Sequence, residues 1–296
     1  MSSHSPSHSA YKLAGIMGWP VAHSRSPSIH NFWIKQYGQT NGFSGSYVLL
    51  PTDPANLKDA LKGLSVLGFA GCNLTIPHKV MALPLVDRIN DTARRMGAIN
   101  TIVVEADGSL SGFNNDGFGY IQSLLDGKPD WQADAGPVLV MGSGGAARAV
   151  IVSLAEKGAK DIRVCNRTDS SAADLAAEFA TDFAQNLGAK ISAVPWAQRH
   201  DAVADIALLV NTTSQGMGSN PALDLNLDKL LVTALVSDVV YIPLETPLLK
   251  AAKTRGNPTA GGLGMLLHQA RPAFQSWFGV MPEVTPELLA AVKATF

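Results

Sequence analysis

A lysine and an aspartate are the side chains of this sequence best suited to move a proton. Residues 72–79, CNLTIPHK, begin like a buried strand, break at a proline and continue with His78 and Lys79. If Lys79 lay in a cleft with Asp116, it could protonate a carbonyl oxygen while the aspartate orients it and the substrate. The sequence also allows a solvated Lys79, an Asn-Asp-Gly turn at 115–117 and a surface position for His78.

A glycine-rich stretch offers a place for a phosphate. In MGSGGAARAV, residues 141–150, Gly142, Gly144 and Ala147 fit the G-x-G-x-x-G/A pattern between a predicted strand and a predicted helix. The first glycine permits a tight turn, the second lets the backbone approach a pyrophosphate, and the small third residue lets the helix pack on the sheet. Because a helix N-terminus would face the anion, this setting predicts a dinucleotide site.

The end of the next predicted strand indicates which dinucleotide is bound. NAD sites usually place Asp or Glu there to bind the ribose hydroxyls. Here the strand ends in Asn166, Arg167 and Thr168, and the guanidinium of Arg167 can bind a 2′-phosphate. NADP is therefore favoured over NAD. The alternative is that Arg167 is a solvated surface residue.

Hydroxyl groups lie at two predicted element ends in the first third of the chain. Ser26, followed by Pro27, can cap a helix, which leaves the hydroxyl of Ser24 available for a ligand. Thr75 would lie at the carboxyl end of a strand, with Lys79 in the first turn of the following helix. A lysine there is unfavourable with the helix dipole, which favours a role for Lys79 beyond helix stability.

The elements that must position these groups alternate between strands and helices. Strands are predicted at 12–17, 45–50, 69–76, 137–141, 161–166, 207–213 and 235–241, and a hairpin at 99–104 and 109–113. Helices are predicted at 26–38, 53–68, from about 77, and at 144–158, with a surface connector at 126–137. This alternation predicts an α/β fold with parallel sheets and helices on both faces.

The balance of charge and hydrophobicity excludes several kinds of partner. Hydrophobic residues make up 46% and charged residues 16% of the 296, as in a well-packed globular protein. A net charge of −1 gives no electrostatic reason to expect nucleic acid or an anionic membrane as partner. No run approaches the roughly 20 apolar residues of a membrane span, and the polar N-terminus does not resemble a signal peptide, so a soluble, cytoplasmic protein is expected.

Cysteine and histidine usage gives no sign of a metal site. Cys72 and Cys165 each lie in an apolar run without C-x-x-C spacing, which predicts buried free thiols in a reducing compartment. The 7 histidines are scattered without the spacing of metal ligands, so no metal is expected.

Six sequence blocks occur in a fixed order along the chain. They are G-x-P-x-x-H-S-x-S-P-x-x-H-N at 18–31, N-x-T-x-P-x-K at 73–79, G-A-x-N-T at 97–101, N-T-T-S-x-G-M at 211–217, D-x-x-Y-x-P-x-x-T at 238–246, and G-x-x-M-L-x-x-Q ending at 269. With these blocks the chain resembles the shikimate dehydrogenase family from about Leu13 to Phe278.

The resemblance implies a two-domain α/β enzyme with a cleft between the domains. Residues 1–115 plus 262–296 would form a discontinuous αβα substrate-binding domain, with 1–10 disordered, and residues 116–261 a Rossmann-type NADP-binding domain. The implied reaction is the reversible NADPH-dependent reduction of 3-dehydroshikimate to shikimate, in the biosynthesis of chorismate and the aromatic amino acids. The implied partner is this small molecule, and the implied assembly a monomer or homodimer.

Carried over position by position, the resemblance makes Lys79 the acid/base residue and Asp116 its partner. The residues it implies for substrate binding are Ser24, Ser26, Asn73, Thr75, Asn100, Tyr241 and Gln269. Those implied for the cofactor are Asp91, Gly142, Ser143, Gly144, Gly145, Ala146, Ala147, Asn166, Arg167, Thr168, Val239 and Gly262. A small polyol acid needs many short hydrogen-bonding side chains, because each unpaired buried polar group penalises a wrong substrate.

Three positions depart from the family pattern. Asn115 replaces the threonine of N-T-D-G, and Gly261 stands where Asp or Asn is usual. Many NADP-using members carry a second basic residue soon after N-R-T, whereas Asp169 and two serines follow here. A missing cation and an added acid predict that NADP is still preferred, but by a smaller margin.

Two other functions remain open on the sequence. One is a quinate or quinate/shikimate dehydrogenase of the same family that uses NAD, against which Ser24, Ser26 and the absence of an acid at position 167 count. The other is a ligand-sensing relative without turnover. The presence of both Lys79 and Asp116 counts against it, since a sensor needs no acid/base pair.

Overall fold

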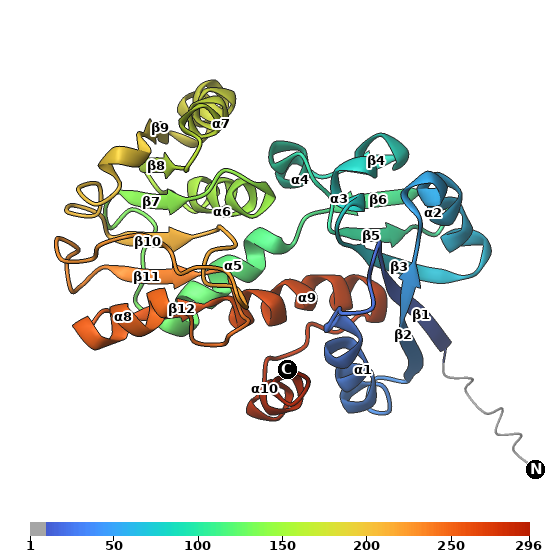
Figure 1. Cartoon of the computed structure of the whole chain (residues 1–296). Helices are drawn as coiled ribbons and strands as arrows, with labels where there is room; N and C mark the ends of the chain where they lie inside the picture. The colour runs from blue at the N-terminus through green and yellow to red at the C-terminus, as the bar shows by residue number, and fades with distance from the viewer. Residues whose placement is uncertain (1–9) are drawn as a thin grey trace, which may run out of the picture. The chain divides into compact units, whose positions relative to one another are not determined.

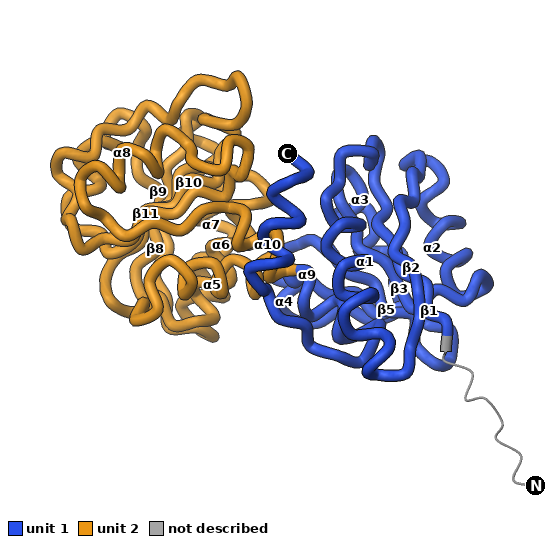
Figure 2. The backbone as a smooth tube through the Cα atoms, turned by 90° about the horizontal axis from the view of Figure 1, so that it is seen from below, with its two compact units in different colours: residues 1–115, 270–296 blue, residues 116–269 orange. Residues whose placement is uncertain are grey.

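The computed structural model describes residues 10–296, which fold into two compact units (Figure 2). Unit 1 combines the described residues up to Asn115 with residues 270–296, and unit 2 is Asp116–Gln269. The helix α9 (Gly262–Phe278) begins in unit 2 and ends in unit 1. The predicted disordered segment 1–10 lies outside the described residues except for Ala10, which begins strand β1.

Unit 1 is built on a six-stranded sheet in the order β2-β1-β3-β5-β6-β4 (Figure 1). Its strands are β1 (Ala10–Gly18), β2 (Phe43–Pro51), β3 (Phe69–Leu74), β4 (Arg88–Ile89), β5 (Thr101–Val104) and β6 (Leu110–Phe113). β1 pairs in parallel with both β2 and β3, as expected. β5 pairs antiparallel with β3 and with β6, so the sheet is mixed and the predicted hairpin is confirmed.

Each helix of unit 1 buries apolar side chains except His78–Met81, whose buried residue is His78. They are α1 (Ser26–Tyr37), α2 (Leu57–Val66), α3 (His78–Met81), α4 (Asp91–Met96) and α10 (Pro286–Lys293), with short 3-10 turns at Pro54–Asn56 and Leu83–Leu85. In α2, Leu57, Leu61 and Leu64 follow helical spacing and pack with Cys72 and Ile102 of the sheet. α3 is a single helical turn that ends at Met81.

Unit 2 has a six-stranded parallel sheet in the order β12-β11-β10-β7-β8-β9. Its strands are β7 (Val138–Met141), β8 (Asp161–Cys165), β9 (Lys190–Val194), β10 (Leu208–Asn211), β11 (Leu235–Asp238) and β12 (Thr259–Gly261). Counted from β7, this is the strand order of the Rossmann fold, in which the connections diverge between the first and the fourth strand. The carboxyl ends of β7 and β10 therefore form the edge where such folds bind nucleotides.

Three helices of unit 2 were not predicted, at Asp116–Gly127, Asp169–Asp182 and Pro247–Arg255. The unit contains α5 (Asp116–Gly127), α6 (Gly145–Glu156), α7 (Asp169–Asp182), the one-turn π-helix η3 (Phe183–Leu187), the 3-10 turn η4 (Trp196–Gln198) and α8 (Pro247–Arg255). Asp116 begins α5, so the predicted turn at 115–117 is wrong. The glycines of α5 are typical of a loop, but Gly119 allows the helix to pack closely against α9. A Cβ there would lie 2.6 Å from the backbone of Met265 and Gln269.

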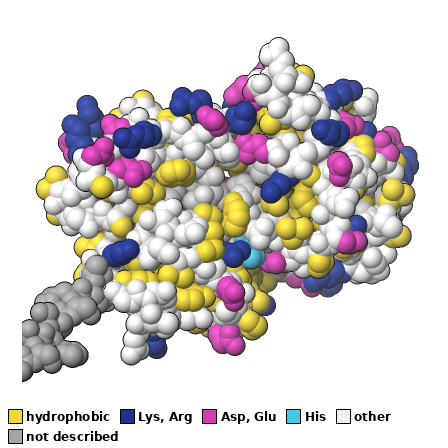
Figure 3. All heavy atoms as spheres, turned by 180° about the vertical axis from the view of Figure 1, so that it is seen from behind, with side chains coloured by type: hydrophobic (Ala, Val, Ile, Leu, Met, Phe, Trp, Pro, Cys, Tyr) yellow, Lys and Arg dark blue, Asp and Glu magenta, His cyan; other side chains and the backbone are white. Residues whose placement is uncertain are grey.

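The cysteines, the helices and the charged side chains bear on the expectations from composition. Cys72 and Cys165 are buried free thiols, as predicted. No helix between residues 10 and 296 is long and apolar enough to cross a membrane. On the face shown in Figure 3, basic and acidic side chains of the described residues are interspersed rather than separated by sign.

His30 lies in an aromatic cluster of unit 1. Its ring stacks on Tyr47 with centroids 4.1 Å apart and planes 3° from parallel, and the rings of Trp33 and Trp277 lie 5.8 and 5.6 Å away. The side chain is fully buried. Burial lowers the pKa of His30 from 6.5 to about 3, so the folded unit holds the imidazole neutral.

Acid should therefore weaken the fold through His30. Below pH 6.5 the unfolded chain binds a proton that the folded chain excludes down to about pH 3. As the pH falls through this window, the free energy of unfolding should decrease by up to roughly 1.4 kcal/mol per pH unit. Above pH 6.5, His30 should not contribute to the pH dependence of unfolding. Urea unfolding measured on both sides of pH 6.5 tests this. His30→Phe keeps a ring but cannot titrate, and an unchanged pH dependence in this variant would contradict the prediction.

Candidate active site

The glycine loop of unit 2 lies at the nucleotide-binding edge of the sheet. Gly142 follows β7 with φ +110°, a conformation that favours glycine, and its N–H donates to Cys165 O at 2.8 Å. Thr212, after β10, donates to Met141 O from both its N–H and its hydroxyl, at 2.9 and 2.7 Å. A Cβ on Gly142 would lie 2.6 Å from Thr212 Oγ1, so the two loops meet closely at this residue.

The N-terminus of α6 is suited to an anion. Gly144 is its N-cap and supplies no side-chain oxygen, so no side chain competes for the first N–H groups of the helix. A Cβ added at Gly144 or Gly145 would meet no atom within 4 Å, whereas Ala147 is fully buried. Open space above the helix start and a small residue beneath it fit the pyrophosphate of a dinucleotide.

The segment after β8 carries the group expected at the ribose. Arg167 is exposed, and Asn166 Nδ2 donates to Thr168 O at 3.1 Å, which closes a short turn around it. Asp169 begins α7, and its Oδ1 accepts the N–H of Trp196 at 2.7 Å. The acid that departs from the family pattern is therefore bonded to the backbone that follows β9.

A further cofactor segment follows β11. Val239 N–H donates to Asn211 O at 3.0 Å, which keeps the chain beside β10 for one more residue. A Cβ on Gly262, the first residue of α9, would lie 2.1 Å from Val239 O. Tyr241, two residues after Val239, is partly buried. Gln269 lies on α9 within the same unit.

In unit 1, buried amides and hydroxyls form one hydrogen-bonded network. Asn73 Oδ1 accepts the hydroxyl of Tyr47 at 2.6 Å, and Asn73 Nδ2 donates to Asn100 O and Thr101 Oγ1 at 3.0 and 3.1 Å. Thr101 donates in turn to Asn100 Oδ1 at 2.8 Å. Asn115 donates its backbone N–H to Asn100 Oδ1 and its amide to Thr101 Oγ1, at 2.9 and 3.0 Å.

This network fixes the surroundings of Lys79. Leu74 N–H donates to Asn100 O, and Ile99 N–H donates to the backbone oxygen of Lys79 at 2.8 Å. Thr75 follows β3, and its N–H donates to Met17 O at 2.9 Å. The structure therefore brings Asn73, Thr75, Lys79 and Asn100 together at the carboxyl end of β3. Asp116 follows the network residue Asn115 directly and is the first residue of α5.

Two expectations near this site are wrong. His78 is fully buried rather than at the surface, and its Nε2 lies 2.8 Å from Thr52 O, so it anchors the α3 turn. Ser26 does not cap α1: the N-cap is Arg25, without a side-chain cap. It is Ser24 Oγ that accepts the N–H of Ser26, at 3.2 Å. The hydroxyl expected to be available thus orders the helix entrance.

The residues that sequence reasoning missed are polar, and all of them except the half-buried Asn115 are buried. Tyr47, Thr101 and Asn115 complete the network of unit 1, and Asp238 is buried at the end of β11. Their sequence signal was a polar residue in or beside an apolar strand. Asp91, expected near the cofactor, is exposed in the first turn of α4, where Asn90 caps the helix by accepting Ala93 N–H at 3.0 Å.

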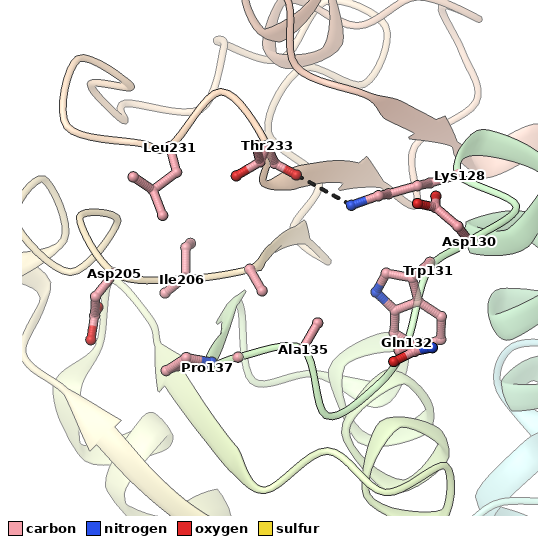
Figure 4. A pocket seen from close by; sticks show the side chains of 12 residues that line it. Lys128, Asp130, Trp131, Gln132, Ala135, Pro137, Asp205, Ile206, Leu231 and Thr233 are labelled. Atoms are coloured by element: carbon pink, nitrogen blue, oxygen red, sulfur yellow. Dashed lines mark hydrogen bonds between the residues drawn. The ribbon is translucent and has the colours of Figure 1, made fainter.

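A separate cavity of about 300 Å³ lies near the amino ends of the strands of unit 2 (Figure 4). Its lining includes Pro137, Ala207 and Thr233, which precede β7, β10 and β11, and Lys128 Nζ donates to Thr233 O at 3.4 Å. Parallel α/β sheets bind nucleotides at the carboxyl ends of their strands, so this cavity is not the dinucleotide site. Among residues 10–296, no group of three or more His, Cys, Asp or Glu could hold a metal ion.

Unit 2 has the features of a dinucleotide-binding domain, and unit 1 has a lysine among short polar side chains. This combination is typical of nicotinamide-dependent oxidoreductases. Family models agree: the shikimate dehydrogenase substrate-binding domain matches residues 16–102, shikimate/quinate 5-dehydrogenase matches 129–214, and the shikimate 5′-dehydrogenase C-terminal domain matches 262–286.

Individual relatives match over nearly the whole chain. Proteins named shikimate dehydrogenase (NADP(+)) from Paramagnetospirillum magneticum and Rhodospirillum rubrum are 47% and 48% identical, over 95% of this chain and 98% and 96% of theirs. The shikimate 5-dehydrogenase of Thermus thermophilus, solved with NADP(H) and shikimate, is 35% identical with a TM-score of 0.80, over 96% of this chain and all of that one. The chain belongs to the shikimate dehydrogenase family, and the predicted two-domain α/β fold is confirmed.

Two glycine variants should separate folding from dinucleotide binding. Gly142→Ala should lower the melting temperature, at a cost of about 1–3 kcal/mol, because of its positive φ and the contact with Thr212. Gly144→Ala should leave the melting temperature unchanged, since its Cβ meets nothing, yet weaken NADP binding by filling space the pyrophosphate needs. Calorimetry of both variants measures this, and wild-type NADP affinity in Gly144→Ala would contradict the assignment.

Proposed function

We propose that this chain is an NADP-dependent shikimate dehydrogenase, which reversibly reduces 3-dehydroshikimate to shikimate in the pathway to chorismate and the aromatic amino acids. The observation that carries the proposal is identity of 47–48% over 95% of the chain with proteins of that name. The dinucleotide features of unit 2 and the polar network around Lys79 in unit 1 support the same function from the structure.

The residues of unit 2 fit NADP. When bound, NADPH supplies the hydride. The N–H groups at the start of α6 would hold the pyrophosphate, beside the open space at Gly144 and Gly145. Arg167, with Asn166 and Thr168, would bind the 2′-phosphate as a charge-assisted pair. Ser143, Ala146 and Ala147 complete this loop, and Val239 and Gly262 would border the nicotinamide end; Asp91 is carried over for the cofactor from the family alone.

Lys79 is the proposed acid/base residue. It donates a proton to the carbonyl oxygen of 3-dehydroshikimate as that carbon is reduced, and takes the proton back in the reverse reaction. Asp116 orients the ammonium group and the substrate. A lysine is suited to this step because its charge stabilises the oxyanion that develops on the oxygen.

Short polar side chains would select the substrate. Ser24, Ser26, Thr75, Asn100, Tyr241 and Gln269 are the proposed partners of the ring hydroxyls and the carboxylate. Asn73 takes a different part, since both ends of its amide are bonded to Tyr47, Asn100 and Thr101. It would therefore position Asn100 in addition to the substrate contact that is predicted for it.

The setting of the enzyme follows from this chemistry. A biosynthetic reductase that uses NADPH and has buried free thiols at Cys72 and Cys165 fits the reducing cytoplasm. The proposed partner is the small-molecule substrate, and the proposed assembly a monomer or homodimer. Nucleic acid and membranes are not among the proposed partners.

Replacing Lys79 tests the proposed mechanism. Lys79→Ala should lower kcat by about 10²- to 10⁴-fold, because no other group then transfers the proton, while the KM for shikimate changes little. Lys58→Ala, at an exposed position of α2 in the same unit, is the matched control and should keep wild-type rates. Full activity of the Lys79 variant would disprove the assigned role.

Replacing Arg167 and Asp169 tests the coenzyme preference. Arg167→Ala should lower kcat/KM for NADP by roughly 10- to 100-fold and leave that for NAD nearly unchanged, because only NADP has the 2′-phosphate. Asp169→Asn keeps an oxygen for the Trp196 N–H but removes the charge, so it should widen the preference for NADP. Kinetics with both coenzymes measure these ratios, and a wild-type preference for NAD would contradict the assignment.

A further inference from the structure

Asp238 is unusual among the acidic residues of this chain. It ends β11 and is 1% exposed, and among the described residues it is the one Asp or Glu in the buried set. Burying a carboxylate is costly unless hydrogen bonds replace its water. The partners of Asp238 therefore indicate what its burial achieves.

Three donors surround this carboxylate. Oδ1 accepts Asn211 Nδ2 and Val240 N–H, both at 3.0 Å, and Oδ2 accepts the hydroxyl of Thr246 at 2.7 Å. Asn211 ends the neighbouring strand β10, and Thr246 caps α8 by accepting the N–H of Leu249 at 3.3 Å. The side chain of Asp238 thus joins the end of β10, the loop after β11 and the start of α8.

Asn211 extends the same set of bonds into the loop after β10. Its Oδ1 accepts the N–H and the hydroxyl of Thr213 at 3.0 and 2.7 Å, and its Nδ2 also donates to Gln215 O at 3.2 Å. The sequence blocks at 211–217 and 238–246, which were separate features of the sequence, are one hydrogen-bonded unit in the structure. Its centre is Asp238.

The charge on Asp238 suits this role. Burial raises the pKa of Asp238, whereas the bonds from Thr246, Val240 and Asn211 lower it by favouring the carboxylate. A carboxylate only accepts, so it can bind a hydroxyl on one oxygen and two N–H donors on the other. An amide of the same shape would point an NH₂ group at one of these donors.

We propose that Asp238 is a positioning residue of the active site. It fixes the segment 239–246, which carries Val239 and Tyr241, against the loop that follows β10. The inference rests on the proposed function, because Tyr241 is assigned to the substrate there. Arg167 lies after β8 and is not part of this network, so binding of the adenosine end should not depend on Asp238.

The experiment compares matched variants of the full chain. In Asp238→Asn and Thr246→Val, kcat/KM for shikimate at saturating NADP should fall roughly 10- to 100-fold, the effect of losing a bond to a buried charge. Thr246→Ser restores the hydroxyl and should recover most of this loss. The dissociation constant of 2′,5′-ADP, which probes the adenosine end alone, should stay within about twofold of wild type.

A control and the contrary outcomes complete the test. Asp201→Asn removes an exposed aspartate of the same unit that pairs with Lys229, and it should match wild type in both measurements. Unchanged kinetics in Asp238→Asn would overturn the inference. Equal loss of 2′,5′-ADP binding would also overturn it, since that indicates a general defect of the unit. Absence of shikimate oxidation by the wild-type chain would instead overturn the proposed function.

Discussion

Buried polar side chains at the ends of the strands must be hydrogen bonded, and both units depend on how this requirement is met. In unit 1, Asn73 and Thr101 tie three segments of chain together around Asn100. In unit 2, Asp238 does the same for the loops after β10 and β11. An unpaired group at any of these positions would cost about 1–3 kcal/mol, so the networks hold one arrangement of the loops.

This constraint explains why residues far apart in sequence act as one site. The amide of Asn73 determines where Asn100 lies, and the backbone of Lys79 is bonded to the residue before Asn100. Shikimate is small and polar, so a rigid set of short donors and acceptors can distinguish it from similar acids. The buried networks supply that rigidity.

The sequence predicted the features that local chemistry decides. The glycine loop with its flanking strand and helix was recognisable, because tight turns and close backbone approach require glycine. The ordered blocks identified the family and with it the candidate site. The start of α5 was misread because Asn115, Asp116 and Gly117 form a good turn in isolation, whereas packing with distant residues, such as that of Gly119 on α9, favours the helix. Burial of His78, Asp238 and Tyr47 was not predictable, since it depends on partners distant in sequence.

The polar network of unit 1 is proposed to serve shikimate, and the strand ends of unit 2 are proposed to serve NADP. The most direct test is kcat/KM of the purified chain with shikimate and with quinate, each with NADP and with NAD. We expect the highest value for shikimate with NADP, lower values for shikimate with NAD, and little turnover of quinate. Turnover of quinate equal to that of shikimate, equal use of NAD, or no oxidation of shikimate would contradict it.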